Sequence, residues 1–588
     1  MIDAVKRRAA RFFSSESDAL PLLLLILLWV VIEVMVNPAG EFPIHDDWVY
    51  AKTVHTLVSQ GKYELCGYQT TTLLAQALWG ALISLCFGFS MTALRFSVIF
   101  LGGLGILAAY RLFRGAGGER WVSFLATLTL MTTPFYVLLS NTFMTDLPFV
   151  VLTITAFVFL ANWLRNKKGS DLALGIFIAC VAGLVRQLAI VIPVAFSLAS
   201  LVQSRFKAKA FLVSILACGA VAATLWVHQR WLIAIGQLPV LYLIKNNVLS
   251  YILKMALGPQ GNVFIPKLFY VFSYNLSNVL MYQGILLFPF MLLMAPRQWK
   301  NFSLNERWGG GAGALLYMAG TVLFLALLHR LMPLSLGMFY NFGLGDETSI
   351  SGGRDLLPKA PLLFWQVLTW VGVLGSGWLV LHIGIMVKRL VFAFVRKKDA
   401  SDQWGSVLCL SAVCVYFFPL GLAGHFDRYQ LFYIPFFLLW MIQGNSGFQR
   451  QKFNRYLLFV AMILLVVVCV FSALATRDYL NRIRTRWNVL RYMMSVQKIS
   501  PLEIDGGYEF NGWYTYDPDY RKKSGMNWWW VVDDKYRISN GPVPEYSILH
   551  MEPYKRLMPP GKGFIFVLKR NAEKRPPETA PGKTVYDF

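Results

Sequence analysis

The chain has 588 residues, of which 56% are hydrophobic and 15% are charged, with a formal net charge of +24. Several apolar runs approach the roughly 20 residues that cross a bilayer core, which excludes an ordinary soluble domain and predicts a polytopic membrane protein. The basic residues fall mostly in short loops between those runs, so the charge indicates membrane topology and no nucleic-acid partner. Seven cysteines show no zinc-like spacing, and we expect neither a disulfide framework nor a cysteine metal site.

The first apolar stretch, residues 20–36, follows a basic head and lacks the small-residue cleavage pattern of a signal peptide. We interpret it as a retained first span. Twelve further apolar segments bring the predicted number of spans to thirteen. They are residues 93–110, 121–139, 147–164, 172–185, 188–203, 211–227, 268–294, 312–328, 361–387, 407–423, 429–442 and 456–475.

Basic residues gather in alternate loops, which predicts that those loops and the N-terminus face the cytoplasm. The stretch 71–90 is apolar, but a span there would invert every later loop. We therefore expect a helix that lies in the outer interface or re-enters it. The basic loops are residues 111–120, 165–168, 205–209, 297–307, 388–398 and 450–455; the outer segments are 37–92, 140–146, 186–187, 228–267, 329–360, 424–428 and everything after 476.

Hydropathy falls sharply after the last predicted span. A Trp528-Trp529-Trp530 run and a strand-like segment at 563–568 indicate a small mixed α/β domain. We therefore divide the chain into a transmembrane domain, residues 1–475, and an extracytoplasmic C-terminal domain, residues 476–588. The tryptophans could stack on a sugar ring, although a tryptophan cluster in a small domain is more often its core or its seat on the membrane interface.

Three aspartates stand on the predicted outer face. Asp46 and Asp47 follow the first span by about ten residues, at the start of a predicted interfacial helix over 47–60. Asp146 precedes Leu147-Pro148, as a helix-capping residue would. Capping explains each acid taken alone. Their arrival on one face of the membrane favours chemistry on a lipid-linked substrate.

Several basic groups on that face could bind a phosphate, since a guanidinium matches two phosphate oxygens at once. Arg186 occupies a very short turn between two spans, and Arg428 opens a span beside His425 and Tyr429. Each could also be an interfacial anchor. The other members of this set are Arg95, Arg330, Arg354 and Lys359, and Glu33 near the end of the first span is a candidate partner for one arginine. No P-loop or G-x-G-x-x-G is present, so nucleotide binding has no support.

Taken together, these motifs resemble GT-C glycosyltransferases, and more narrowly the bacterial relatives of protein O-mannosyltransferases and of the aminoarabinose transferase that modifies lipid A. The resemblance rests on residues 46–52, 61–63, 94–96, 142–146 and 427–431 with Pro435, and is densest over 20–165. It implies about thirteen transmembrane helices with juxtamembrane helices and a soluble C-terminal domain. It also implies that Asp46 and Asp47 are the family's acidic pair, of which one acid serves as catalytic base or orients the acceptor, and that Asp146 is the acid of the second outer loop.

One departure from the family concerns the phosphate. The aminoarabinose transferases carry a phosphate-contacting lysine in a Glu-Lys-Pro motif, whereas residues 68–72 here read Tyr-Gln-Thr-Thr-Thr. This puts lipid A as acceptor in doubt and leaves phosphate binding to other basic groups, among which Arg428, Arg186, His425, Arg95 and Tyr429 are the candidate substrate-binding residues.

The leading hypothesis is an inverting glycosyltransferase of the bacterial cytoplasmic membrane. It would move a sugar from a polyprenyl phosphate to a lipid, glycan or protein acceptor, with Asp46 as base and Asp47 and Asp146 in the catalytic site. We expect no cofactor, since nothing in the sequence supports a divalent ion. A transporter or flippase of lipid-linked saccharides, which would need charges at mid-membrane depth, and a polymerase or ligase with a large basic outer loop are the alternatives.

Overall fold

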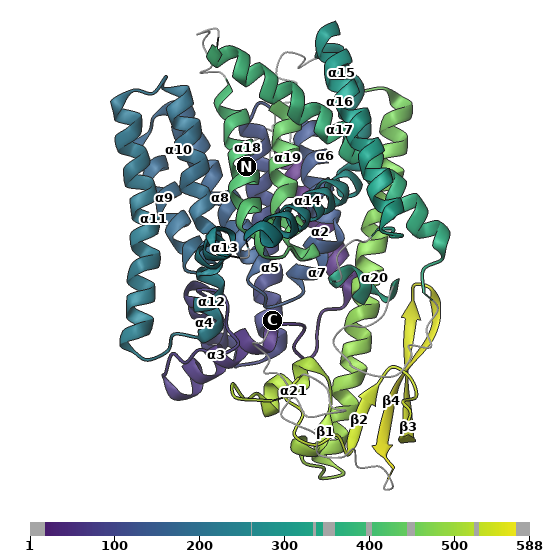
Figure 1. Cartoon of the computed structure of the whole chain (residues 1–588). Helices are drawn as coiled ribbons and strands as arrows, with labels where there is room; N and C mark the ends of the chain where they lie inside the picture. Colours follow the sequence, from purple (N-terminus) through teal and green to yellow (C-terminus); the bar gives the residue numbers. More distant parts are fainter. Residues whose placement is uncertain are drawn as a thin grey trace, which may run out of the picture.

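A bundle of long helices forms most of the molecule, and a small sheet lies at one end of it (Figure 1). The computed structural model describes residues 18–259, 261–332, 337–344, 359–395, 403–443, 453–521 and 529–571. Within these ranges, eight helices are long and apolar enough to cross a membrane, or up to eleven if each of three bent pairs is one span. The protein is therefore a polytopic α-helical membrane protein with a small C-terminal sheet, as the sequence predicts.

Each of the thirteen predicted spans contains a helix. In chain order these are α2 (Ala19–Val36), α5 (Met91–Gly115), α6 (Arg120–Thr132) with α7 (Pro134–Ser140), α8 (Asp146–Asn166), α9 (Gly169–Gly183), α10 (Val191–Gln203), α11 (Ala208–Ala234), α14 (Gly261–Leu286) with α15 (Phe288–Asn301), α16 (Leu304–Leu327), α17 (Leu362–Val395), α18 (Trp404–Ala423), α19 (Gln430–Gln443) and α20 (Arg455–Ser495). Three of them, α9, α10 and α19, are short. A further bent pair, α12 (Val240–Asn246) with α13 (Val248–Leu257), lies in the stretch predicted as an outer loop.

Two segments predicted as single spans are broken. The axis turns by 62° between α6 and α7 and by 87° between α14 and α15. Thr133 is extended, with φ −64° and ψ 144°, because a residue before proline is disfavoured in the helical region. Pro289 stands in the first turn of α15, where its missing N–H cannot bond back into α14. After the first break, α7 leads directly into residues 141–145, which are all buried.

The helices α14 and α17 cross in close contact at glycines. A Cβ placed on Gly375 would lie 2.3 Å from the carbonyl oxygen of Gly284. Small residues at a crossing let two helix backbones approach within a membrane, where dispersion contacts are the main attraction. Any side chain at this point forces the helices apart.

Replacing Gly375 by Ala is therefore expected to destabilise the protein by about 1 to 3 kcal/mol, the usual cost of overpacking. Thermal unfolding of the purified protein in detergent measures the effect. The matched control is Gly384→Ala on the same helix, since a Cβ there meets nothing within 4 Å. Equal unfolding temperatures for the two variants would contradict the proposed close crossing.

Two short helices and the sheet lie at the same end of the bundle (Figure 1). The helices are α3 (Asp47–Gln60) and α4 (Leu74–Phe87). The sheet has the order β1-β2-β4-β3, with β1 (Ile504–Asp505) parallel to β2 (Tyr536–Ser539) and the remaining pairs antiparallel. The other two strands are β3 (Tyr546–Leu557) and β4 (Pro560–Arg570), and the short helix α21 (Tyr508–Thr515) precedes β2.

The C-terminal part is continuous with the bundle. The strand predicted at 563–568 lies inside β4, which confirms that prediction. The helix α20 is 41 residues long and runs without interruption across the predicted domain boundary at residue 475. The last membrane helix therefore carries the chain directly into the sheet region, and the division into two domains stays a prediction.

Candidate active site

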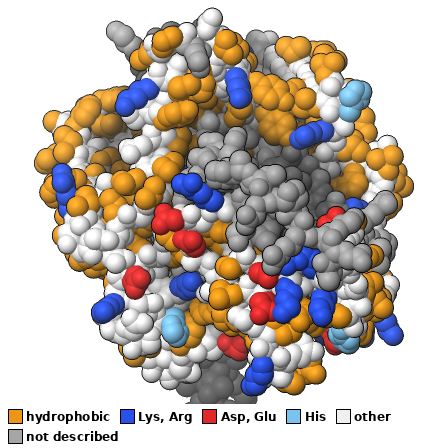
Figure 2. Space-filling view, turned by 60° about the horizontal axis from the view of Figure 1, so that its bottom comes forward, with side chains coloured by type: hydrophobic (Ala, Val, Ile, Leu, Met, Phe, Trp, Pro, Cys, Tyr) orange, Lys and Arg blue, Asp and Glu red, His pale blue; other side chains and the backbone are white. Residues whose placement is uncertain are grey.

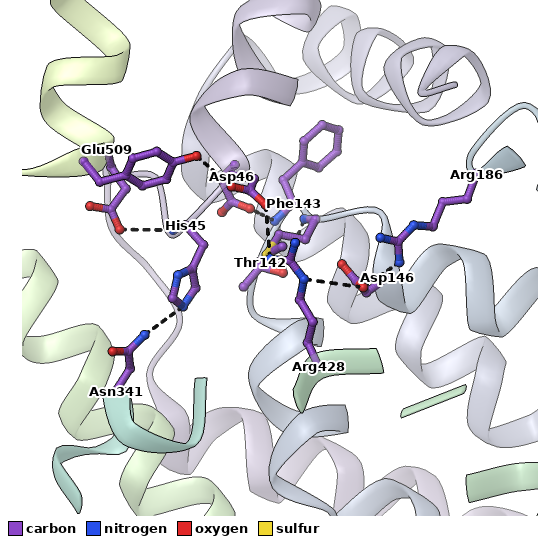
Figure 3. Close-up of polar contacts among 12 residues, drawn as sticks. His45, Asp46, Thr142, Phe143, Asp146, Arg186, Asn341, Arg428 and Glu509 are labelled. Atoms are coloured by element: carbon purple, nitrogen blue, oxygen red, sulfur yellow. Dashed lines mark hydrogen bonds and ion pairs between the residues drawn. The ribbon is translucent and has the colours of Figure 1, made fainter. Parts of the chain in front are cut away.

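Two acids and two arginines, distant in the chain, meet near the end of the bundle that carries the sheet (Figure 3). Asp46 precedes α3, Asp146 opens α8, Arg186 precedes the turn η1 (Gln187–Ile190), and Arg428 lies in the turn before α19. The Nη1 atom of Arg428 is 3.1 Å from Oδ2 of Asp46, and its Nε is 3.9 Å from Oδ1 of Asp146. Arg186 donates from Nη1 to the same Asp146 oxygen at 2.5 Å. Arg428 thus bridges the two carboxylates.

Helix capping does not account for the direction of these acids. Asp46 occupies the position before α3, but its side chain accepts no hydrogen bond from the amides of that helix. Asp146 is in the first turn of α8, and its carboxylate pairs with Arg186. The helix dipoles still favour a negative charge at both places. Local structure therefore positions the acids, while their carboxylates face distant partners.

The charges of the cluster balance in a partly enclosed site. The side chains of Asp146 and Arg186 are 3% and 7% exposed, whereas those of Asp46 and Arg428 are 24% and 17% exposed. Burial by itself would raise the pKa of Asp46, but the Arg428 guanidinium and a hydrogen bond from Tyr508 outweigh it and hold that pKa below its ordinary value. Burial likewise opposes the charge of Arg428, yet the two carboxylates raise its pKa well above the usual range. An incoming anion would meet Arg428 first, since it is the more exposed arginine.

Asp47 lies beside this cluster but has a different setting. Its Oδ1 accepts a hydrogen bond from the N–H of Phe143 at 2.9 Å, and its Oδ2 accepts one from the N–H of Ile44 at 3.3 Å. The side chain is buried, and burial raises its pKa to about 7 against the lowering effects of Arg95 and these two amides. Asp47 therefore joins the segment after α2 to the loop that precedes Asp146.

Replacing Asp47 by Asn is expected to destabilise the protein by about 1 to 3 kcal/mol, because an amide NH2 would face one of the two backbone N–H groups in place of an oxygen. The unfolding temperature in detergent measures the loss. Asp519→Asn, at an exposed position, is the control and should unfold like the wild type. A wild-type unfolding temperature for the Asp47 variant would exclude this joining role.

Arg95, a predicted substrate-binding residue, is hydrogen-bonded to the backbone after α2, and its part in substrate binding stays a prediction. Its guanidinium donates to the carbonyl oxygens of Pro38, Gly40 and Phe42 at 2.7, 3.1 and 2.7 Å. These bonds hold the Arg95 guanidinium against the extended segment after α2. Glu33, the candidate partner for an arginine, instead accepts hydrogen bonds from Ser140 at 3.2 Å and Asn141 at 2.9 Å.

Tyr429 supports both arginines of the cluster. Its ring centre lies 5.4 Å from the guanidinium carbon of Arg186 and 5.7 Å from that of Arg428, within the range of cation–π attraction. His425 packs edge-on against Tyr429 with ring centres 5.6 Å apart, and its Nε2 is 3.2 Å from the Tyr433 hydroxyl. Burial lowers the pKa of His425 to about 3, so it is neutral. His425 therefore contacts Tyr429 as a neutral ring, and its part in substrate binding stays a prediction.

The remaining basic groups of the predicted set are Arg330, Arg354 and Lys359. The Nη1 atom of Arg330 donates to the Tyr274 hydroxyl at 3.3 Å, and Arg354 lies outside the described residues. Charged side chains of both signs gather on the face of the molecule that carries the sheet (Figure 2). In the ranges that the structure describes, no group of three His, Cys, Asp or Glu residues is placed to hold a metal ion.

Sequence reasoning missed the contribution of α21. The Tyr508 hydroxyl donates to Oδ1 of Asp46 at 2.7 Å. Glu509 accepts a hydrogen bond from the N–H of His45 at 3.2 Å. More than 460 residues separate these partners, and no motif in the C-terminal region signals the contact. Trp530 is part of the same packing, since its ring lies 5.3 Å from that of Trp48, while Trp528 lies outside the described residues.

Comparison with known proteins bears on the family. Residues 74–231, about a quarter of the chain, match the family described as dolichyl-phosphate-mannose-protein mannosyltransferase. The match confirms the resemblance to GT-C glycosyltransferases. This GT-C segment contains Asp146 and Arg186, whereas Asp46 and Arg428 lie outside it. No curated protein matches the chain.

Solved structures of GT-C proteins are similar to this chain at low identity. ArnT from Cupriavidus metallidurans bound to undecaprenyl phosphate is 12% identical, with 95% of this chain and 98% of that one covered and a TM-score of 0.42. The apo oligosaccharyltransferase of Archaeoglobus fulgidus is 12% identical, with 82% and 59% covered and a TM-score of 0.42. AglB from the same organism, in complex with an inhibitory peptide and a dolichol-phosphate, is 11% identical, with 83% and 58% covered and a TM-score of 0.40. This chain thus spans less than two thirds of the archaeal enzyme.

Proposed function

We propose that the protein is an inverting glycosyltransferase that moves a sugar from a polyprenyl phosphate to a hydroxyl of a lipid, glycan or protein acceptor. The observation that carries this proposal is the Arg428 bridge between Asp46 and Asp146. A phosphate-binding cation and a carboxylate base are the two groups that such a transfer needs, and here they are in direct contact.

The reaction follows from these groups. The acceptor oxygen attacks the anomeric carbon from the face opposite the phosphate, and the carbon–oxygen bond to the phosphate breaks with inversion. Asp46 takes the acceptor proton, a role that typically contributes about 100- to 10,000-fold in rate. Arg428 neutralises the charge that develops on the departing phosphate. Asp146 holds both arginines in place, because its Oδ1 atom contacts each of them.

Donor and base are coupled through Arg428. Without a donor, its guanidinium pairs with Asp46 and keeps that carboxylate a weak base. A phosphate competes for the same N–H donors, so donor binding weakens the ion pair and raises the pKa of Asp46. The base therefore gains strength when the sugar donor is in place.

The proposed orientation puts this site on the outer face of the bacterial cytoplasmic membrane. Its support is the charge of the loops at the other end of the bundle, which obey the positive-inside rule. The helix α20 begins at Arg455, the last residue of a basic loop in the sequence, and ends beside the sheet (Figure 1). Membrane lipids surround the helices, and the acceptor would approach from the side of the sheet.

Label transfer tests the function. The full-length protein, purified and placed in liposomes, is supplied with undecaprenyl phosphates that carry a radiolabelled hexose or pentose. A transferase moves the label from the lipid donor to an acceptor or, slowly, to water. The label then no longer extracts into the organic phase with the donor. Label that crosses the bilayer while it stays on the lipid would instead identify a flippase. Envelope lipids and proteins are supplied as acceptors. If none of the donors then releases its label, the proposal is rejected.

A further inference from the structure

Two consecutive residues of α21 bind two consecutive residues at the candidate site. Tyr508 donates to Oδ1 of Asp46 at 2.7 Å, and Glu509 accepts from the N–H of His45 at 3.2 Å. His45 has a φ of +50°, a left-handed conformation that is uncommon for residues other than glycine. The start of α21 therefore fixes the chain where it turns into α3.

The Tyr508 side chain has little freedom of its own. It is 8% exposed, and its ring packs against Trp529 at 4.7 Å and Trp48 at 5.9 Å between centres. Aromatic neighbours of this kind fix both the position and the tilt of a ring. The packed ring therefore fixes the position of the hydroxyl that bonds to Asp46.

Glu509 anchors the same helix on its other side. Its carboxylate is fully buried and pairs with Nη2 of Arg486 on α20 at 2.7 Å. A buried ion pair of this geometry is costly to break. Since α20 is also the last membrane helix, the position of Tyr508 is tied to the bundle and not to the sheet alone.

Each carboxylate oxygen of Asp46 therefore has a partner. Tyr508 holds Oδ1, and Arg428 contacts Oδ2. When a donor phosphate draws Arg428 away, Oδ2 is the oxygen that becomes available to an acceptor hydroxyl, while Oδ1 stays bonded to the tyrosine.

We propose that Tyr508 is a positioning residue for the transfer reaction, which fixes the Asp46 carboxylate so that Oδ2 faces the acceptor. The proposal rests on the function of Asp46 as base. It assigns part of the active site to the C-terminal region. A hydrogen bond to a carboxylate also favours its charged form, so Tyr508 lowers the pKa of Asp46 together with Arg428.

The variant Tyr508→Phe removes the hydroxyl and keeps the packed ring. We expect kcat for release of label from the undecaprenyl-phosphate donors to fall roughly tenfold with little change in KM, as loss of one charge-assisted hydrogen bond would give. The acid limb of the pH profile should move to higher pH, because the charged form of Asp46 loses a hydrogen-bond donor. A purely structural role would lower activity and leave that limb in place.

Two further variants separate the possible outcomes. Tyr516→Phe, in the same aromatic cluster with its ring 5.6 Å from that of Trp48, should keep both the wild-type rate and the wild-type pH profile. Asp46→Asn tests the function on which the proposal rests. An inactive Asp46→Asn variant beside a Tyr508→Phe variant with an unshifted pH profile overturns the positioning role alone. Full activity in both overturns the assignment of Asp46 as well.

Discussion

Replacing Asp46 by Asn is expected to lower kcat for sugar transfer by about 100- to 10,000-fold, since the acceptor hydroxyl loses its base. The substitution keeps the size of the side chain and does not change Arg428 or Tyr508. Because Asn carries no charge, Arg428 loses its ion pair with residue 46, so the affinity for undecaprenyl phosphate should be unchanged or higher. Label release measures kcat, and binding of unlabelled undecaprenyl phosphate by native mass spectrometry measures the affinity.

The matched control for this substitution is Asp171→Asn. Asp171 lies in the first turn of α9, at the opposite end of the bundle from the site. The Asp171→Asn variant should retain full activity, expression and membrane insertion. Wild-type turnover in Asp46→Asn, with the protein folded, would remove Asp46 from the mechanism and leave the role of base without a candidate.

Replacing Arg428 by Ala is expected to weaken undecaprenyl phosphate binding by roughly 10- to 100-fold, the usual worth of a charge-assisted hydrogen bond. A second effect concerns pH. The charge of Arg428 is the main cause that lowers the pKa of Asp46. Without that charge the pKa of Asp46 should rise, and the acid limb of the activity profile should move to higher pH. Titration of binding and a pH series of label release measure the two effects.

A lysine at the same position separates charge from geometry. Arg428→Lys keeps the charge but offers no planar fork that could contact Asp46 and Asp146 together, so it should recover part of the binding and little of the rate. Arg330→Ala is the control, because its side chain bonds to the Tyr274 hydroxyl. Unchanged donor affinity in Arg428→Ala would mean that another group binds the phosphate.

Apolar segments of about 20 residues are recognisable without any knowledge of their neighbours, which is why the helices and the fold class followed from hydropathy. The bends at Thr133 and Leu287 were not predicted. A proline near a helix start is visible in the sequence, but the angle between the two helices depends on what each of them packs against. The length of α20 was also missed, since its polar second half follows the membrane part without a break.

The sequence by itself determined that acids would stand at the starts of helices on one face of the membrane, because span alternation and helix-start signals are local properties. Only the tertiary structure decided which of them face one another. Asp46 and Asp47 are neighbours in sequence, yet one carboxylate meets Arg428 and the other is occupied by backbone amides. Arg95 and Arg428 are the same residue type on the same face, yet Arg95 is bound to carbonyl oxygens. The direction of a side chain, and the arrival of Tyr508 at Asp46, depend on the packing of segments hundreds of residues apart, which no local pattern encodes.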